Sequence, residues 1–191
     1  MSVTTLVRRF VLGAAALGLS VSALAQQKLL PEQSEIAFVA RQMGVPLDGK
    51  FRKFDAQISF DVAKPQTSKI AFTVDVGSAT LGSRETDAEL PKAPWFNVPK
   101  FPQASFQSSS VKALGGGKFE VAGQLTIKGT AREVLVPVTL TQSGAVTTAT
   151  GTLPLKRLAF KIGENEWADT SMVADDVQVK FKLALQGVGK L

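Results

Sequence analysis

The sequence predicts an all-β fold of about eight antiparallel strands. Apolar residues recur at every second position over most of the chain, as in residues 54–61, "FDAQISFD", and residues 177–185, "VQVKFKLAL". Glycine and proline clusters separate these runs. Strict alternation gives each strand one buried face and one solvated face, which is typical of antiparallel sheets.

Turn residues divide the alternating runs into separate strands. Pro65 follows the second run, three glycines at 115–117 follow the fourth, and Gly129 follows the fifth. Such residues are typical of tight connections. The expected strands are 34–41, 50–61, 67–77, 104–112, 117–129, 132–142, 147–162 and 175–186. Eight antiparallel strands can form a sandwich or a closed barrel, and a closed barrel has no edge strands.

Residues 78–103 interrupt the strand pattern. The segment "SRETDAEL" predicts a short helix that ends before Pro91. Trp95 and Phe96 follow on an irregular connection. A connection of this length is often a lid or a binding loop, and it can equally be a plug that covers one end of a barrel.

The first 25 residues resemble an export signal. Arg8 and Arg9 precede an apolar stretch that ends in small residues, and Ala23-Leu24-Ala25 fits a cleavage site. The stretch is short for a transmembrane anchor. General secretion is favoured over the twin-arginine route because the residue before the arginines is valine. The sequence therefore predicts cleavage after Ala25, a mature domain at 26–191 and a periplasmic location.

Composition excludes several classes of function. The chain has neither cysteine nor histidine, so disulfides and the usual ligands of zinc, copper and haem are lacking. No EF-hand loop is present. The net charge is +6, of which the two arginines before the apolar stretch supply two, and no basic run predicts a nucleic-acid surface. A modest attraction to anionic lipid surfaces is compatible with this charge.

No arrangement of residues predicts catalysis. A nucleophile needs a base within reach, and the chain carries no G-x-S-x-G motif. Glu164 with Glu166, and Asp175 with Asp176, lie in turn-like segments where solvated carboxylates are the simpler interpretation. The glycines of "LGGGKF" lack phosphate-loop spacing and fit a hairpin. We expect no catalytic residue, no metal and no cofactor.

The aromatic composition favours a dry interior. Twelve phenylalanines stand against no tyrosine, and phenylalanine buries a ring without a hydroxyl that needs a partner. Such faces suit a filled core and an apolar ligand cavity equally well.

Four segments together resemble the YceI-like family of exported lipid-binding proteins. They are "SEIAFVARQMGVPLDGKFRKFDAQISFD" at 34–61, "WFNVPKFPQASFQSSSV" at 95–111, "GQLTIKGTAREVLVPV" at 123–138 and "GENEWADTSMVADDVQVKF" at 163–181. The resemblance implies an eight-stranded lipocalin-like barrel, with the irregular insertion between its third and fourth strands, that encloses a polyisoprenoid. Many family members carry a histidine where this chain has Gln42. The acid that often precedes the phenylalanine of "RLAF" is also absent, so Arg157 is expected to have another partner.

We therefore expect a carrier for an isoprenoid lipid such as a quinone or a prenyl phosphate, acting as a monomer or a homodimer. Expected lining residues are Phe38, Phe60, Phe72, Val74, Phe106, Phe119, Leu125, Phe160 and Phe181, with Trp95 and Phe96 closing one mouth. Arg41, Gln42 and Arg84 are candidates for contact with a head group. The alternatives are a packed barrel that serves as a structural or stress-response interaction module, and a cofactorless hydrolase or isomerase.

Overall fold

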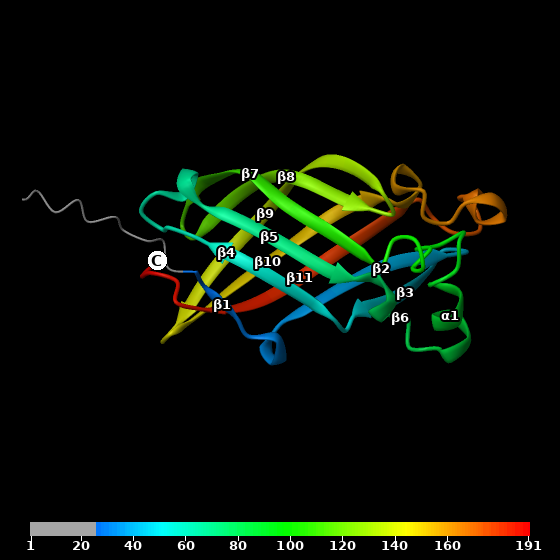
Figure 1. The fold of residues 1–191 in the computed structure, drawn as a ribbon, viewed down its shortest axis with the longest axis horizontal. Helices are drawn as coiled ribbons and strands as arrows, with labels where there is room; N and C mark the ends of the chain where they lie inside the picture. The colour runs from blue at the N-terminus through cyan, green and yellow to red at the C-terminus, as the bar shows by residue number, and fades with distance from the viewer. Residues whose placement is uncertain (1–25) are drawn as a thin grey trace, which may run out of the picture.

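The computed structural model describes residues 26–191, so the predicted export signal lies outside the described residues. Within them the chain forms one antiparallel sheet of eleven strands that curls into an elongated barrel (Figure 1). The strands are β1 Lys28–Leu29, β2 Glu35–Gln42, β3 Val45–Phe51, β4 Phe54–Ser59, β5 Lys69–Asp75, β6 Ala79–Thr80, β7 Gln103–Gly115, β8 Lys118–Ile127, β9 Thr130–Ser143, β10 Val146–Lys156 and β11 Asp176–Gln186. The predicted all-β antiparallel fold is confirmed.

The sheet closes on itself through the beginning of the mature domain. Its strands run in the order β4-β5-β7-β8-β9-β10-β11-β2-β3-β6, and β1 pairs with β11. Just before β1, the backbone N–H of Gln27 donates to the carbonyl of Ile58 in β4, at 2.9 Å. The Gln27 side chain also accepts from the N–H of Phe60 at 2.6 Å. The N-terminal segment thus joins the first strand of the series to β11.

The strand count exceeds the predicted eight because three strands are defined by pairing alone. Strands β1 and β6 have two residues each and carry no alternation. Strand β3 contains Pro46 and Gly49, which obscure its pattern, and it forms because a two-residue turn folds it onto β2. That turn, Met43-Gly44, has positive φ at both residues (49° and 81°), as a tight hairpin requires.

The predicted strand 50–61 is two strands. Residues up to Phe51 belong to β3, which pairs with β2 and β6, whereas β4 pairs with β5. Between them, the N–H of Arg52 donates to the carbonyl of Ser78 at 3.2 Å. The chain therefore changes neighbours at Arg52-Lys53, which a run of alternating residues does not reveal.

The predicted strand 147–162 is too long. Strand β10 ends at Lys156, and Arg157–Phe160 form a 3-10 helix instead. The other helices are α1 Arg84–Glu89 and the 3-10 helices Pro31–Gln33, Pro65–Thr67, Val76–Ser78 and Asn165–Ala168. The short helix predicted before Pro91 is confirmed by α1.

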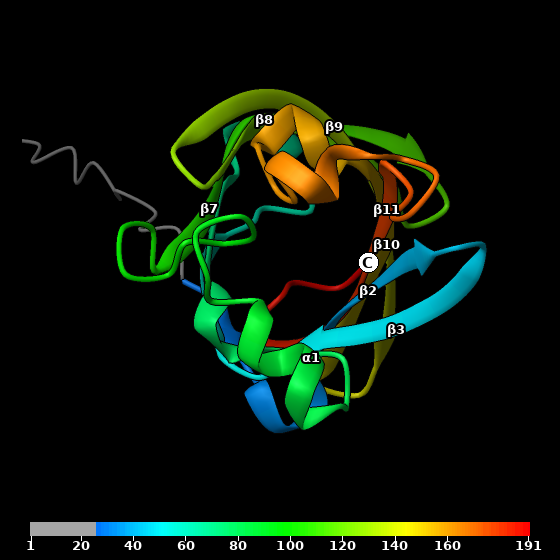
Figure 2. The ribbon, with the colours of Figure 1, turned by 90° about the vertical axis from the view of Figure 1, so that its right-hand side faces the viewer.

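The two ends of the barrel differ. Figure 2 looks along the barrel and shows α1 on one side and the 3-10 helices of residues 157–168 on the other, around the near end. We call this end, covered by residues 81–101 and 157–174, the mouth. At the far end, the rings of Phe60 and Phe119 meet edge to face with centroids 5.2 Å apart. Aromatic pairs favour this geometry, and we call this end the floor.

Candidate ligand cavity

The barrel interior contains two adjoining apolar cavities. The one beneath the mouth has a volume of about 250 Å³, and the one above the floor about 190 Å³. We call them the mouth cavity and the floor cavity. Five residues line both: Ile36, Val74, Leu125, Leu153 and Val179. The two cavities therefore lie end to end along the barrel, and a ring of aliphatic side chains forms a waist between them.

All eleven residues expected to line a cavity do face one. The mouth cavity is lined by Phe38, Trp95, Phe96 and Phe160, the floor cavity by Phe60, Phe72, Phe106, Phe119 and Phe181, and Val74 and Leu125 lie at the waist. Those on strands converge because inward positions alternate along every strand of a barrel, whereas Trp95, Phe96 and Phe160 lie on the covers of the mouth. Whether these side chains contact a ligand remains a prediction.

Several lining rings lie across glycines of the neighbouring strand. Phe38 is directly opposite Gly49 in the β2–β3 ladder, and Phe181 is opposite Gly151 in the β10–β11 ladder. A methyl group at Gly151 would lie 2.3 Å from the Phe181 ring and 2.4 Å from the carbonyl oxygen of Pro137. Both glycines therefore let an aromatic ring lie close against the wall, which leaves the centre of the barrel open.

Helix α1 is fixed to the sheet through one carboxylate. Asp87 accepts hydrogen bonds from the Thr80 hydroxyl at 2.5 Å and from the N–H of Leu81 at 2.6 Å. The bond from Thr80 is the main cause that lowers the pKa of the Asp87 carboxyl, followed by the bond from Leu81. The helix presents Thr86 and Glu89 to the mouth cavity.

Arg157 holds the other cover of the mouth. Its side chain is buried, with only 2% of the residue exposed. Its guanidinium donates to five backbone carbonyls at 2.6 to 3.0 Å, those of Ile162, Gly163, Trp167, Val173 and Ala174. An arginine has five N–H donors, so all of them are used. Burial lowers the pKa of this guanidinium, and the charge of Asp175 partly opposes that shift.

The turn of the chain around Arg157 requires a glycine. Gly163 has a φ of 77°, and a methyl group there would lie 2.1 Å from Nη1 of Arg157. The backbone of Ile162 and Gly163 therefore passes close to the guanidinium of Arg157. The absence of an acid in "RLAF" predicted that Arg157 has another partner. That partner is a set of backbone carbonyls.

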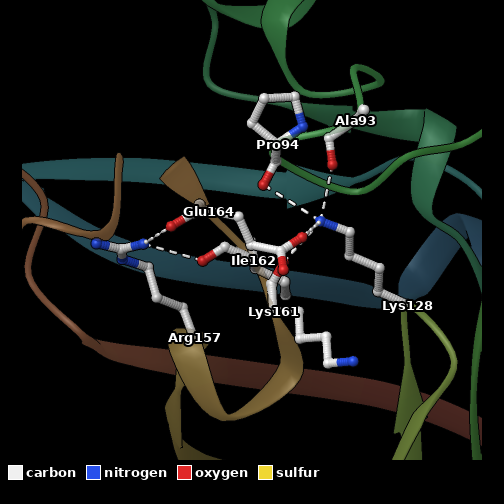
Figure 3. Close-up of polar contacts among 8 residues, drawn as sticks. Ala93, Pro94, Lys128, Arg157, Lys161, Ile162 and Glu164 are labelled. Atoms are coloured by element: carbon white, nitrogen blue, oxygen red, sulfur yellow. Dashed lines mark hydrogen bonds and ion pairs between the residues drawn. The ribbon is translucent and has the colours of Figure 1, made fainter. Parts of the chain in front are cut away.

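Lys128 joins the two covers of the mouth to each other (Figure 3). It lies in the β8–β9 turn, and its buried ammonium donates to the carbonyls of Ala93 at 2.8 Å and Lys161 at 2.6 Å. It also contacts the carbonyl of Pro94 at 3.3 Å and the carboxylate of Glu164 at 2.8 Å. The three N–H donors of the ammonium therefore face four acceptors, so all three donors are used.

Two tryptophans meet where the covers touch. The rings of Trp95 and Trp167 lie with centroids 5.4 Å apart, and both residues line the mouth cavity. The Trp95 Nε1–H is buried, and within residues 26–191 it has no hydrogen-bond partner. A buried donor without an acceptor costs about 1–3 kcal/mol. The closed covers therefore leave one polar group unsatisfied beside the cavity.

The three candidate head-group contacts are not brought together. Gln42 lines the mouth cavity, but Arg41 and Arg84 are exposed and line neither cavity. Arg41 points away because successive residues of β2 face opposite sides of the sheet. Arg84 is at the solvated start of α1.

Sequence reasoning placed Trp95 and Phe96 at a mouth but missed the roles of three other residues there. Arg157, Lys128 and Trp167 carried no periodic signal, because each acts through contacts between segments distant in the chain. Two local signals were available. The "KG" at 128–129 is a hairpin turn that fixes where the lysine emerges, and the pair Lys156-Arg157 interrupts an otherwise apolar run, "LPLKRLAF".

Other kinds of site find little support in the described part of the chain. Residues 26–191 contain no group of three or more acidic side chains placed to hold a metal ion. Among the helices of the same range, none is long and apolar enough to cross a membrane.

The sequence profile of YceI-like domains matches residues 28–185. The chain belongs to this family. A curated member, a UPF0312 protein of Ectopseudomonas mendocina (strain ymp), is 35% identical over 130 residues, which cover 66% of this chain and 67% of the relative. The YceI-like assignment inferred from the four segments is therefore confirmed.

Solved structures of similar proteins share the barrel. BcnA of Burkholderia cenocepacia has a TM-score of 0.80 and 45% sequence identity, over 82% of this chain and 99% of BcnA. A polyisoprenoid-binding domain from Saccharophagus degradans, implicated in plant cell wall breakdown, has a TM-score of 0.68 and 15% identity, over 86% of this chain and 99% of that domain. At 15% identity the second comparison supports the fold alone.

Proposed function

We propose that this YceI-like protein is a periplasmic carrier that encloses a single isoprenoid chain along the barrel axis. The observation that carries the proposal is the pair of apolar cavities joined at the waist. A long and narrow apolar space suits a linear branched hydrocarbon. Together the two volumes fall within the range of ligand pockets, about 300–1,000 Å³.

The binding energy would come from burial of the hydrocarbon. Each methylene removed from water contributes about 0.8 kcal/mol, and contact with the wall adds dispersion energy. An isoprene unit has five carbons, so a few units would support tight binding. Binding rather than catalysis is proposed because the lining is almost wholly apolar.

Two further observations support this function. The same fold occurs in a polyisoprenoid-binding domain from Saccharophagus degradans, so a barrel of this architecture is able to hold such a chain. The apolar stretch that ends at Ala25 fits an export signal, which supports a periplasmic location. A fully packed interaction module is disfavoured by the size of the two cavities.

The direct test is the intact mass of the exported protein, purified without detergent and recorded under native conditions. A co-purifying prenyl lipid at about one molecule per chain would support a carrier and identify its cargo. A protein that is empty and also takes up no added isoprenoid would contradict the proposal. The same spectrum reports whether the protein is a monomer or a homodimer.

Ligand uptake is expected to change the fluorescence of Trp95. This ring lines the mouth cavity beside Trp167, so a Trp167→Phe variant isolates its emission. Titration with an isoprenoid should quench or shift that emission, because the ligand replaces empty space against the indole. Unchanged emission under conditions where the mass spectrum shows a bound lipid would mean that Trp95 does not contact the cargo.

We also propose that the mouth touches a membrane when cargo is exchanged. Met43 and Val45 at the β2–β3 turn are 72% and 61% exposed, and Met172 is 42% exposed. The N–H of Met43 donates to the carbonyl of Met172 at 2.8 Å, so the three side chains stand on adjacent segments. Their neighbours Gln42 and Val173 line the mouth cavity. An apolar rim beside the opening suits shallow insertion into a bilayer.

A Met43→Ser/Met172→Ser double variant tests this contact. It should co-sediment several-fold less with phosphatidylethanolamine–phosphatidylglycerol vesicles than the parent protein. Leu114→Ser is the matched control, since Leu114 is similarly exposed on β7 and does not line the mouth cavity. Equal loss of sedimentation in the control would show that the effect is not local to the mouth.

A further inference from the structure

Strands β9 and β10 are joined over only part of their length. Their ladder pairs Thr139–Ser143 with Val146–Thr150 and ends there. Each strand continues beyond that point while it remains paired with its other neighbour, β9 with β8 and β10 with β11. The facing edges of residues 130–138 and 151–156 therefore share no ladder. We call this stretch of the barrel wall the seam.

Two prolines explain where the ladder stops. In an antiparallel pair, positions that exchange hydrogen bonds alternate with positions that do not. The two-residue turn between the strands sets the odd-numbered residues of β9 in bonded positions against β10. Continued past the ladder, this register would set Pro137 opposite Thr152. It would then set Pro154 opposite Leu135. Proline has no N–H, so each of the next two bonded pairs lacks one of its two bonds.

The seam lies directly against the interior. Val136 of β9 lines the floor cavity, Leu155 of β10 lines the mouth cavity, and Leu153 lies at the waist. On the outside, a surface depression begins where the ladder stops, and Phe119 and Val138 line both this depression and the floor cavity. Along the seam the wall is therefore closed by packed side chains, which can part without breaking a ladder.

Side-chain contacts cross the seam at its mouth end. Arg132 of β9 donates from Nε to the carbonyl of Ala159 at 3.0 Å, in the 3-10 helix that follows β10. Lys128, in the turn before β9, donates to the carbonyl of Lys161 and to the carboxylate of Glu164 beyond that helix. These contacts hold the two edges together. Arg132 is exposed, so water can replace its bond when the edges part.

We propose that the barrel opens laterally along the seam, so that a cargo chain enters sideways along its length instead of being threaded end-on through the mouth. This inference rests on the proposed carrier function and concerns how cargo is exchanged. Threading would drive a flexible chain past the covers and then through the waist. Parting of the seam moves Leu153 with the edge of β10, which widens the waist and joins the two cavities.

A Pro137→Val/Pro154→Val variant tests the proposal, because it restores both N–H groups and should extend the ladder. Neither proline lines the mouth cavity or the floor cavity. Transfer of radiolabelled geranylgeraniol from the protein to phosphatidylcholine vesicles should become several-fold slower. The equilibrium partition, which reports affinity, should stay within twofold. Thr141→Val/Thr148→Val is the matched control, because it adds two valines to the paired part of the same strands and no donor.

Arg132→Met should act in the opposite direction and speed transfer several-fold, because it removes a bond that crosses the seam. Transfer rates that neither variant changes would overturn the lateral route and leave the carrier function intact. If hydrogen exchange shows that the valines have not extended the ladder, Arg132→Met alone decides between these outcomes.

Hydrogen exchange also tests the seam without any cargo. In the parent protein the N–H of Leu135, which faces the seam, should exchange much faster than the N–H of Thr139, which lies within the ladder. Equal protection of the two amides would overturn the seam. A parent protein that takes up no geranylgeraniol would instead count against the carrier function, and the exchange result would then stand by itself.

Discussion

Replacing Arg157 with methionine is expected to lower the free energy of unfolding by at least about 3 kcal/mol. The guanidinium satisfies five carbonyls between residues 162 and 174. Each buried carbonyl left without a donor costs about 1–3 kcal/mol, although those that reach water recover part of this. Urea unfolding measures the total. Hydrogen exchange should show that the loss of protection is concentrated at 157–174.

The control for this variant is Arg132→Met. Arg132 is exposed, and within residues 26–191 its side chain makes a single hydrogen bond, from Nε to the carbonyl of Ala159 at 3.0 Å. We expect a change of about 0.5 kcal/mol or less, as for most surface substitutions. Arg157→Lys should lie between the two, because three donors cannot serve five carbonyls. Equal stability of the Arg157→Met variant and the parent would mean that the cover does not depend on this side chain.

Replacing Phe72 with aspartate is expected to weaken isoprenoid binding at least about 100-fold, or 2.7 kcal/mol. Phe72 faces the floor cavity from β5, opposite Phe106 and Ala56 on the neighbouring strands. A carboxylate there would have to lose its water when a tail enters. Burial raises the pKa of such a group, so binding should partly recover as the pH falls and the carboxyl becomes neutral.

The matched control places the same charge on the outer face. Ser105 is exposed on β7, where it lies opposite Thr73, the residue after Phe72. Ser105→Asp should bind as the parent does. Circular dichroism must first show that Phe72→Asp retains its β-structure, and Phe72→Leu serves as a milder variant if it does not. A folded Phe72→Asp protein with parental affinity would place the tail elsewhere.

The sequence predicted the wall of the cavity better than its openings. Alternation identified the inward faces of β5, β7, β8 and β11, so residues such as Phe72 and Phe181 were placed correctly in the interior. It could not identify β3 or the short strands β1 and β6. These exist because a neighbouring segment offers its backbone for pairing, and that partner is distant in the chain for β1 and β6.

The head-group candidates show the same limit. Arg41 and Gln42 are adjacent in the chain, yet Gln42 lines the mouth cavity and Arg41 is exposed. An arginine is a reasonable candidate for an anionic group on its chemistry alone. In the folded chain, however, the arginine that reaches the cavity is Arg157, and the backbone already uses its donors. The presence of an arginine in the sequence therefore did not predict a cationic side chain that is free to bind a ligand.

By itself the sequence determined the fold class, the family and the apolar character of the interior. These depend on local periodicity and on runs of fixed residue types, which a chain carries wherever it folds. Only the tertiary structure decided that the interior holds two cavities, and that Arg157 and Lys128 close the mouth. A cavity is the volume left after all side chains have packed, and a buried cation is defined by the distant carbonyls around it. Neither quantity is a property of any one segment.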